Sequence, residues 1–131
     1  MVYDSKNVNV TVKGALLTGF GSGSFVSCAK NAPNIVPYVG VKGETAESIV
    51  NDNTGTVTVT LQHTSPSNKL LSDLANRRES FGISVTDINE GGFVAGGNDA
   101  KIVTTATNER SGEIGDRAWE IYVADYSDVA R

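Results

Sequence analysis

Residues 55–62 alternate strictly between apolar and polar side chains. The apolar positions are Val57, Val59 and Leu61; the polar positions carry no charge and are mostly β-branched, and they are Thr56, Thr58, Thr60 and Gln62. A period of two is typical of a strand with one dry face and one wet face. Because no group on the wet face can act unaided as an acid, base or nucleophile, we expect this face to line something rather than to hold an active site.

The same alternation, interrupted by turn residues, predicts further strands. We expect strands at 8–13, 15–20, 24–30, 35–41, 81–88, 100–107 and 117–126, with a Gly-rich loop at 89–99 and a polar loop at 108–116. Pro37 predicts an edge position or a bulge for its strand, since proline cannot donate to a ladder. Residues 42–53 mix polar and apolar positions and end in turn-forming residues, so we expect a long, mobile hairpin arm near 42–53.

One short α-helix is predicted near residues 66–77. Ser65 is a good N-cap and Pro66 is well tolerated in the first turn. An apolar stripe at helical spacing follows, made of Leu70, Leu71, Leu74 and Ala75. The chain is therefore expected to be a single domain, residues 1–131, of mainly β class (α+β): a β-sandwich or barrel-like fold with one short helix.

The composition of the chain limits the classes of function that it can have. The net charge is −4 and the isoelectric point is near 4.9. Because it has no basic patch, the chain is a poor candidate for tight binding of nucleic acid, although nucleic acid could slide past such a surface. The polar start lacks a signal-peptide core, and no apolar run approaches the length of a membrane helix, so we expect synthesis in a cytoplasm and no membrane association.

Candidate chemistry is sparse. Residues 19–23 suggest a phosphate loop only weakly, because a predicted strand and not a helix follows them. His63 is the only histidine and Cys28 the only cysteine, which favours a strand-end polar residue and a small core residue over a metal site or, beside Lys30, a reactive thiol. Trp119 is in phase with apolar neighbours, which favours a core position over a sugar-stacking platform. We expect no enzyme, no cofactor and no metal.

Residues 55–74, an alternating Thr/Val strand followed by a Thr-Ser-Pro turn and a Leu-rich helix, resemble the small tail tube proteins of long-tailed bacteriophages, most often those with contractile tails. Residues 3–8, the Gly19-Phe20-Gly21 turn, the strand at 81–85 and residues 116–121 also fit. The resemblance implies hexameric rings that stack into a hollow tube. Strands of six subunits join into one inner barrel, through which the genome is delivered and which a tape-measure protein fills beforehand.

On this hypothesis the polar strand faces the lumen and the arm joins successive rings. The candidate lumen-facing residues are Thr56, Thr58, Thr60, Gln62, Ser84 and Thr86; the candidate inter-ring contacts are Glu44, Glu47, Ile49 and Val50. The implied partners are further copies of the chain, tail sheath, tape-measure and baseplate or terminator proteins, and viral DNA that passes without specific binding. The implied location is the tail of a virion assembled in the host cytoplasm.

The sequence leaves two other classes of function open. The first is the tube protein of a bacterial secretion system or of a phage-tail-like bacteriocin, which shares the fold. The second is a monomeric β-sandwich that binds carbohydrate, which would need exposed, coplanar aromatic side chains.

Overall fold

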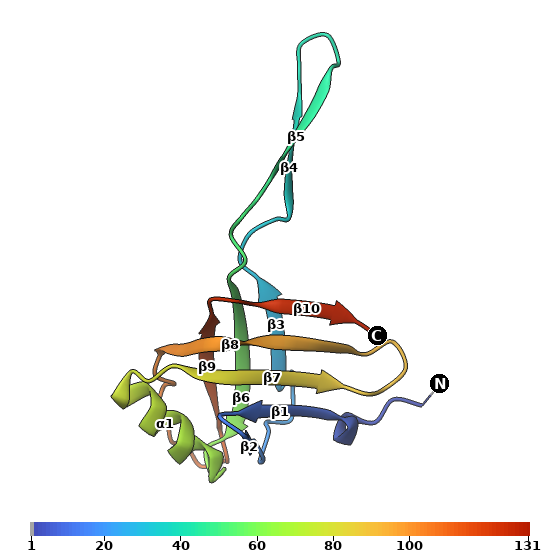
Figure 1. The fold of residues 1–131 in the computed structure, drawn as a ribbon. Helices are drawn as coiled ribbons and strands as arrows, with labels where there is room; N and C mark the ends of the chain where they lie inside the picture. The colour runs from blue at the N-terminus through green and yellow to red at the C-terminus, as the bar shows by residue number, and fades with distance from the viewer. Residues whose placement is uncertain (1) are drawn as a thin grey trace.

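A computed structural model describes residues 2–131 and confirms a mainly β fold with one short α-helix (Figure 1). A single turn of 3₁₀ helix, Ser5–Asn7, precedes the first strand. The strands and the helix are β1 (Val8–Val12), β2 (Ala15–Leu16), β3 (Val26–Lys30), β4 (Ile35–Val39), β5 (Thr45–Ile49), β6 (Gly55–Gln62), α1 (Ser67–Arg77), β7 (Phe81–Asp87), β8 (Phe93–Thr104), β9 (Asp116–Val123) and β10 (Ser127–Ala130).

Most strands belong to one antiparallel sheet that folds over itself. Its order is β2-β1-β7-β8-β9-β6-β3, and β10 pairs with the first half of β8. The long strand β8 is shared by two layers. One, the β7 layer, contains β2, β1, β7, β10 and the first half of β8; the other, the β6 layer, contains the second half of β8, β9, β6 and β3. The strands of the two layers cross one another in Figure 1.

The core lies between the two layers. The apolar positions of β6, Val57, Val59 and Leu61, are fully buried, as their phase predicts. The other layer meets them with Val10 and Val85. Burial of such side chains stabilises the fold by about 1.5–3 kcal/mol each, and it leaves the opposite face of β6 free of any core role.

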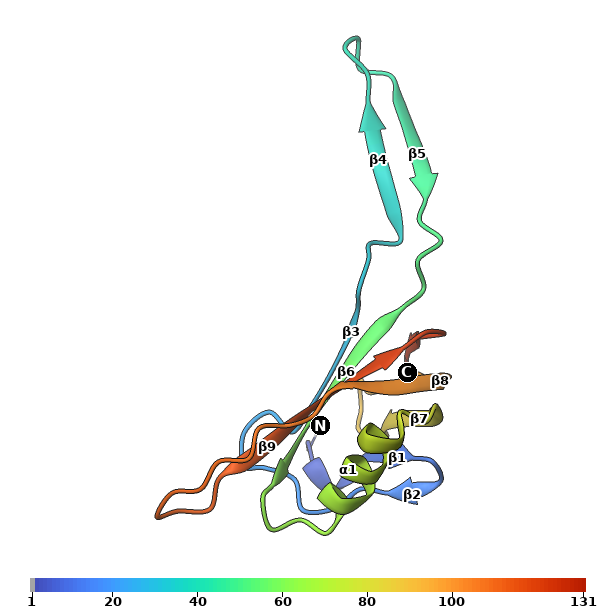
Figure 2. The same cartoon turned by 90° about the vertical axis from the view of Figure 1, so that its left-hand side faces the viewer.

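Helix α1 packs against one end of the sandwich (Figure 2). Leu71 and Leu74 are buried in the core. The Oγ of Ser65 accepts a hydrogen bond from the N–H of Ser67 at 3.2 Å, so Ser65 caps the first turn. Arg78 ends the helix in the left-handed conformation, with φ of 53°. The predicted helix near 66–77 is confirmed.

The Gly-rich loop predicted at 89–99 is wrong in its second half, because β8 already begins at Phe93. Gly96 has a φ of +137°, and a Cβ atom there would collide with the carbonyl oxygen of Ile83. A Cβ on Gly97 would meet Val123 and Asp125. These glycines let the strands approach closely where β8 passes from one layer to the other. Composition alone cannot distinguish glycines that serve this purpose within a strand from glycines in a loop.

The strand predicted at 117–126 is confirmed as β9, but its predicted end is wrong. Strand β9 ends at Val123, and the chain turns through Tyr126 into β10. The Tyr126 ring occupies the space above Gly55, and its N–H donates to the carbonyl of Asn53 at 3.0 Å. The strand predicted at 15–20 is shorter than expected and covers only β2.

Strands β4 and β5 pair only with each other and form an arm that projects from β3 and β6 (Figures 1 and 2). The predicted strand at 35–41 is confirmed as β4, and Pro37 lies in a two-stranded ribbon where each strand is an edge. The arm is longer than the expected 42–53, because it also contains β4. Its mobility stays a prediction.

Candidate functional site

The wet face of β6 lies in the middle of the β6 layer, between β3 and β9. Its side chains are half-buried because those of the two neighbouring strands flank them. Thr56 is opposite Ala29 and Tyr122, and Thr58 is opposite Ser27 and Glu120. Together these strands form one broad sheet surface, which we call the polar face; its members on β6 are Thr56, Thr58, Thr60 and Gln62.

Two carboxylates lie on the polar face beside the threonines. Glu120 is opposite Thr58, and Asp116 is opposite Gln62; both side chains are exposed. Lys101 is opposite Tyr122, at the side of the face farthest from β3. The phase of β9 alone shows that Glu120 points away from the core, but only the pairing of β6 with β9 brings it next to Thr58.

Ser84 and Thr86 do not join the polar face. They lie on β7, where Ser84 is opposite Thr11 and Gly96 and Thr86 is opposite Asn9. Their neighbours Ile83 and Val85 point into the core, so Ser84 and Thr86 point outward from the β7 layer. The two layers enclose one core, and their outer faces therefore point in opposite directions. The structure thus separates these two residues from the four on β6.

The arm carries apolar side chains that nothing in the described chain covers. Ile49 is 76% exposed and Tyr38 is 69% exposed. The other large exposed apolar residues of the arm are Ile35, Val36, Val39 and Val41. An apolar surface of this extent on a thin ribbon indicates a contact with another molecule.

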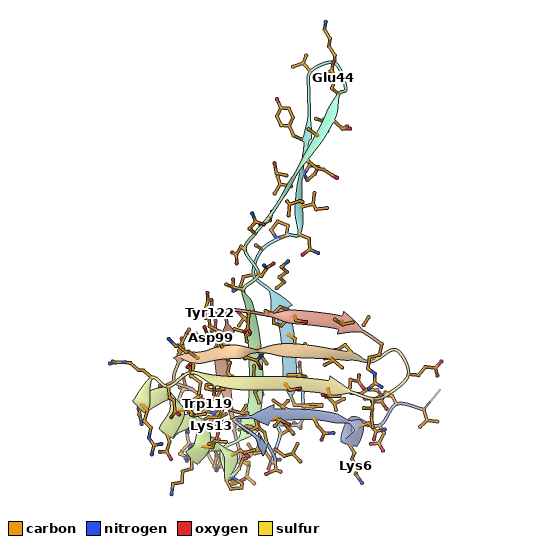
Figure 3. All side chains as sticks on the ribbon, viewed as in Figure 1. Lys6, Lys13, Glu44, Asp99, Trp119 and Tyr122 are labelled. Atoms are coloured by element: carbon orange, nitrogen blue, oxygen red, sulfur yellow. The ribbon has the colours of Figure 1, made fainter. Side chains whose placement is uncertain are left out.

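The arm's predicted contact residues are distributed along its length. Glu44 lies near the tip, as Figure 3 shows, and Glu47 is on β5 opposite Pro37. Val50 lies at the base, where its N–H donates to the carbonyl of Asn34 at 3.0 Å. The arm thus carries carboxylates at its tip and midway along it, whereas exposed aliphatic groups extend from Ile49 at the root to Val39 and Val41 near the tip.

The base of the arm is fixed by a small polar network. The N–H of Asn31 donates to the carbonyl of Thr54, and the hydroxyl of Thr56 donates to Oδ1 of Asn31 at 2.8 Å. Hydrogen bonds from the hydroxyl and N–H of Thr54 lower the pKa of the Asp52 carboxyl. Because Thr56 belongs to the polar face, the arm and the polar face are parts of one continuous structure.

The other residues considered as candidates for chemistry, His63, Cys28 and Trp119, have environments that fit a structural role. The Nδ1 of His63 accepts a hydrogen bond from the N–H of Gly115 at 3.1 Å. Burial raises the pKa of the Cys28 thiol to about 11, with Asp128 adding to it, so a reactive thiolate is disfavoured. Trp119 is fully buried and is no platform for a sugar. Among residues 2–131 no cluster of three or more metal-ligating side chains occurs, and no helix is both long and apolar enough to span a membrane.

Solved structures share this fold at low sequence identity. A sheath/tube terminator of an extracellular contractile injection system, PVC, in the extended state has a TM-score of 0.70 at 14% identity, over 98% of this chain and 96% of the other. A chain of the PVC sheath-tube complex gives 0.67 at 15% identity, over 98% and 91%. A chain of the virion of a native gene transfer agent particle gives 0.66 at 11% identity, over 99% of both.

A family comparison is more specific. No curated protein matches the chain. The sequence model described as "Bacteriophage PhiTE tail tube protein" matches residues 1–89, which include β6, α1 and β7. The match covers well over half of the chain and confirms the resemblance drawn from residues 55–74. The chain belongs to the family of the bacteriophage PhiTE tail tube protein, a family of structural proteins of the phage tail.

Proposed function

We propose that the protein is the repeating subunit of a tail tube, in which hexameric rings stack into a hollow conduit for genome delivery. The observation that carries this proposal is the joint geometry of the polar face and the arm. Both are built on β3 and β6, and the arm continues beyond the ends of these strands (Figure 2). A stacked tube needs two such features. One is a sheet surface that lines a channel, and the other is a ribbon that extends in the same direction to the next ring.

The polar face is the proposed wall of the lumen, with Thr56, Thr58, Thr60 and Gln62 exposed to the channel. DNA binds proteins tightly where lysine and arginine displace its counterions. The β6 row offers no such group, and on the same surface the carboxylates of Glu120 and Asp116, which repel phosphate, outnumber the one lysine, Lys101. DNA would therefore pass without specific binding. Ser84 and Thr86 are not part of this wall, because they lie on the opposite side of the sandwich.

The arm is the proposed contact between rings. Ile49 is largely exposed in the single subunit, and burial against the next ring would supply the apolar cover that it lacks. Val50 at the root and the carboxylates of Glu44 and Glu47 would contribute to the same contact. We expect the arm to be mobile in an isolated subunit and fixed in the tube, because it has few contacts of its own.

The proposed partners follow from the place of such a tube in a virion tail. They are further copies of this chain, a tail sheath, a tape-measure protein, and baseplate or terminator proteins, with assembly in the host cytoplasm. The similar structures described above come from a sheath-tube complex, a sheath/tube terminator and a virion, which supports a tail sheath and a terminator as partners in a virion tail.

The tube protein of a bacterial secretion system or of a phage-tail-like bacteriocin is the second candidate, since two of the similar chains belong to an extracellular contractile injection system. The fold alone does not separate the two functions. Nuclease-protected DNA in the purified particle separates them: a phage tail belongs to particles that carry DNA, whereas a secretion or bacteriocin tube carries none.

Replacing the arm tests the proposed function. Asn34 and Val50 are hydrogen-bonded neighbours, so a two-residue Asn-Gly turn can replace residues 35–49 without disturbing β3 or β6. We expect a folded subunit that does not form tubes. Shortening the exposed loop at 109–113 is the matched control and should leave tubes intact. Tubes of normal length from the arm-replaced protein, seen by negative-stain electron microscopy, would contradict the proposal.

A further inference from the structure

We infer that the turn between β7 and β8 of one copy docks into a groove beside helix α1 of the next copy, where Glu90 pairs with Arg78. This inference rests on the proposed ring and names a side-chain contact between its subunits. It follows from the direction of β7, from the charge and shape of the surfaces at the two ends of that strand, and from the way in which the turn is held.

Strand β7 runs from one flank of the subunit to the other. Helix α1 ends just before β7 begins, and the turn, residues 88–92, follows the last residue of β7. The seven residues of β7 separate the two flanks by roughly 23 Å. Figure 1 shows β7 lying across β6, so the ends of β7 point sideways when β6 runs along the proposed tube. Rotation about the tube axis therefore brings the turn of one copy to the α1 flank of the next.

A groove of about 570 Å³ opens on the α1 flank, between the end of α1 and the second half of β8. Phe81 at the start of β7 is opposite Ala100, which places this half of β8 on the same flank as α1. The residues of the described chain that line the groove include no acidic one, although the chain has a net charge of −4. They include two cations and three apolar side chains, namely Arg78, Lys101, Ala75, Ile102 and Val103. The groove therefore suits a carboxylate that has an aliphatic neighbour.

Arg78 is fixed in position by the end of the helix and has an open charge. Its backbone has a φ of 53°, and its N–H donates to the carbonyls of Ala75 and Leu74. Its side chain is exposed. Among residues 2–131 the one ion pair joins Lys13 to Glu79, so no carboxylate of the same copy neutralises Arg78. The guanidinium is therefore available to a carboxylate of another copy.

The turn on the other flank has the complementary chemistry. It is closed by the N–H of Gly92, which donates to the carbonyl of Asn89 at 3.0 Å, and Glu90 lies at its corner. The Glu90 side chain is exposed and forms no ion pair with any residue from 2 to 131. Ile88, at the start of the turn, is 57% exposed. Docking would bring Glu90 to Arg78 and cover Ile88 with the apolar residues of the groove.

The turn is held in place by Asn89, a buried polar residue in an otherwise exposed turn. Its Oδ1 accepts from the N–H of Asp4 at 3.1 Å, and its Nδ2 donates to Oδ1 of Asp87 at 2.8 Å. The carbonyl of Gly92 accepts from the N–H of Arg131 at 2.8 Å. The turn is thus bonded both to the segment before β1 and to the residue after β10. A protrusion fixed in this way loses little conformational entropy on docking, which favours the contact.

Exchange of the two charges tests the pairing. Glu90→Arg and Arg78→Glu each place like charges in the contact, so each should raise the protein concentration needed for rings by about tenfold or more. The double variant Glu90→Arg with Arg78→Glu should restore rings near the unmodified concentration. Glu113→Arg, in the exposed loop before β9, makes the same change in net charge and should have no effect. Electron microscopy counts the rings, and circular dichroism checks that each variant is folded.

Two results of this exchange would overturn the inference. One is ring formation by Glu90→Arg or Arg78→Glu at the unmodified concentration. The other is a folded double variant that forms rings no better than the single variants do, because a purely structural effect of either substitution would not be cancelled by the other.

Crosslinking tests the same contact with both charges kept. Ile88 and Val103 are exposed, one in the turn and one in the groove, so Ile88→Cys with Val103→Cys in a Cys28→Ala background places one thiol on each side. A short bismaleimide added to rings should give a ladder of covalent oligomers up to the closed ring, whereas Ile88→Cys alone should give none. Rings without crosslinks from the pair, or dimers from Ile88→Cys alone, would overturn the docking but leave the ring standing. Unmodified protein that never forms rings would contradict the proposed function as well.

Discussion

The indole N–H of Trp119 donates a hydrogen bond to Oδ1 of Asn68 at 3.0 Å, and this bond joins helix α1 to the buried face of β9. The side-chain amide of Asn68 in turn donates to the carbonyl of Gln62 at 2.9 Å, at the end of β6. The helix, the core tryptophan and the strand that carries the polar face are therefore held as one unit. This explains why a polar residue is buried at a helix position that faces the core.

Asn68→Ala should lower the free energy of unfolding by about 1–3 kcal/mol, because it leaves the buried Trp119 N–H without a partner and removes one of the two hydrogen bonds to the Gln62 carbonyl. Urea denaturation of the subunit measures the change. Asn76→Ala is the matched control on the exposed side of the same helix and should change stability by no more than about 0.5 kcal/mol. Equal effects of the two substitutions would show that the hydrogen bonds of Asn68 contribute nothing.

Gly96→Ala should destabilise the subunit by roughly 2 kcal/mol or more. The residue has a φ of +137°, and the new Cβ would collide with the backbone of Ile83 on β7. Gly112→Ala, where a Cβ meets nothing within 4 Å, is the control and should be close to neutral. A Gly96→Ala protein with an unchanged thermal midpoint would mean that β8 does not approach β7 as described.

Asp125→Asn should lower stability at neutral pH but not in acid. The N–H groups of Asp99 and Asn98 donate to the carboxylate, which lowers its pKa in the folded state. A lowered carboxyl pKa adds stability above the unfolded value, about 3.9, and this contribution is lost as the pH falls through the folded pKa. Thermal midpoints of the two proteins should differ at pH 7 and converge toward pH 2. A difference that is the same at both pH values would contradict the role of the charge.

Thr60→Lys should permit assembly but slow genome ejection, because each ring would then place several cations at one level of the lumen. Thr58→Lys should act more weakly, since Glu120 lies directly opposite and offsets part of the charge, whereas Thr60 is opposite Ala118. Ejection rates measured at increasing salt should recover toward the unmodified rate. Ser84→Lys, on the opposite side of the sandwich, is the control; an equal slowing by Ser84→Lys would refute the lumen assignment.

Local pattern predicts much of this fold. The alternation at 55–62 and the phase of Trp119 with Ile121 identify β6, β9 and the core-facing positions of both strands, because side-chain direction in a strand depends only on parity. The spacing of the leucines identifies α1 for the same kind of reason. In both cases burial depends on a repeat that is visible within about ten residues.

Features set by distant contacts are not predictable in this way. Gly96 and Gly97 read as a loop, yet they lie in β8 because Ile83 and Val123 approach them from other strands. Ser84 has the polarity expected of a lumen residue, but the fold of the sheet into two layers turns it away from Thr58. The length of the arm depends on β4 pairing with β5, which the mixed pattern at 42–53 does not encode.

Cryo-electron microscopy of the assembled protein is the most direct test of the proposed tube. We expect six-fold rings stacked into a tube, with Thr56, Thr58, Thr60 and Gln62 on the wall of the lumen and the arm of each subunit in contact with the next ring. A map in which this row faces the outside of the tube or lies buried between subunits would contradict the lumen assignment, and protein that stays monomeric at high concentration, even on a baseplate template, would contradict the tube itself.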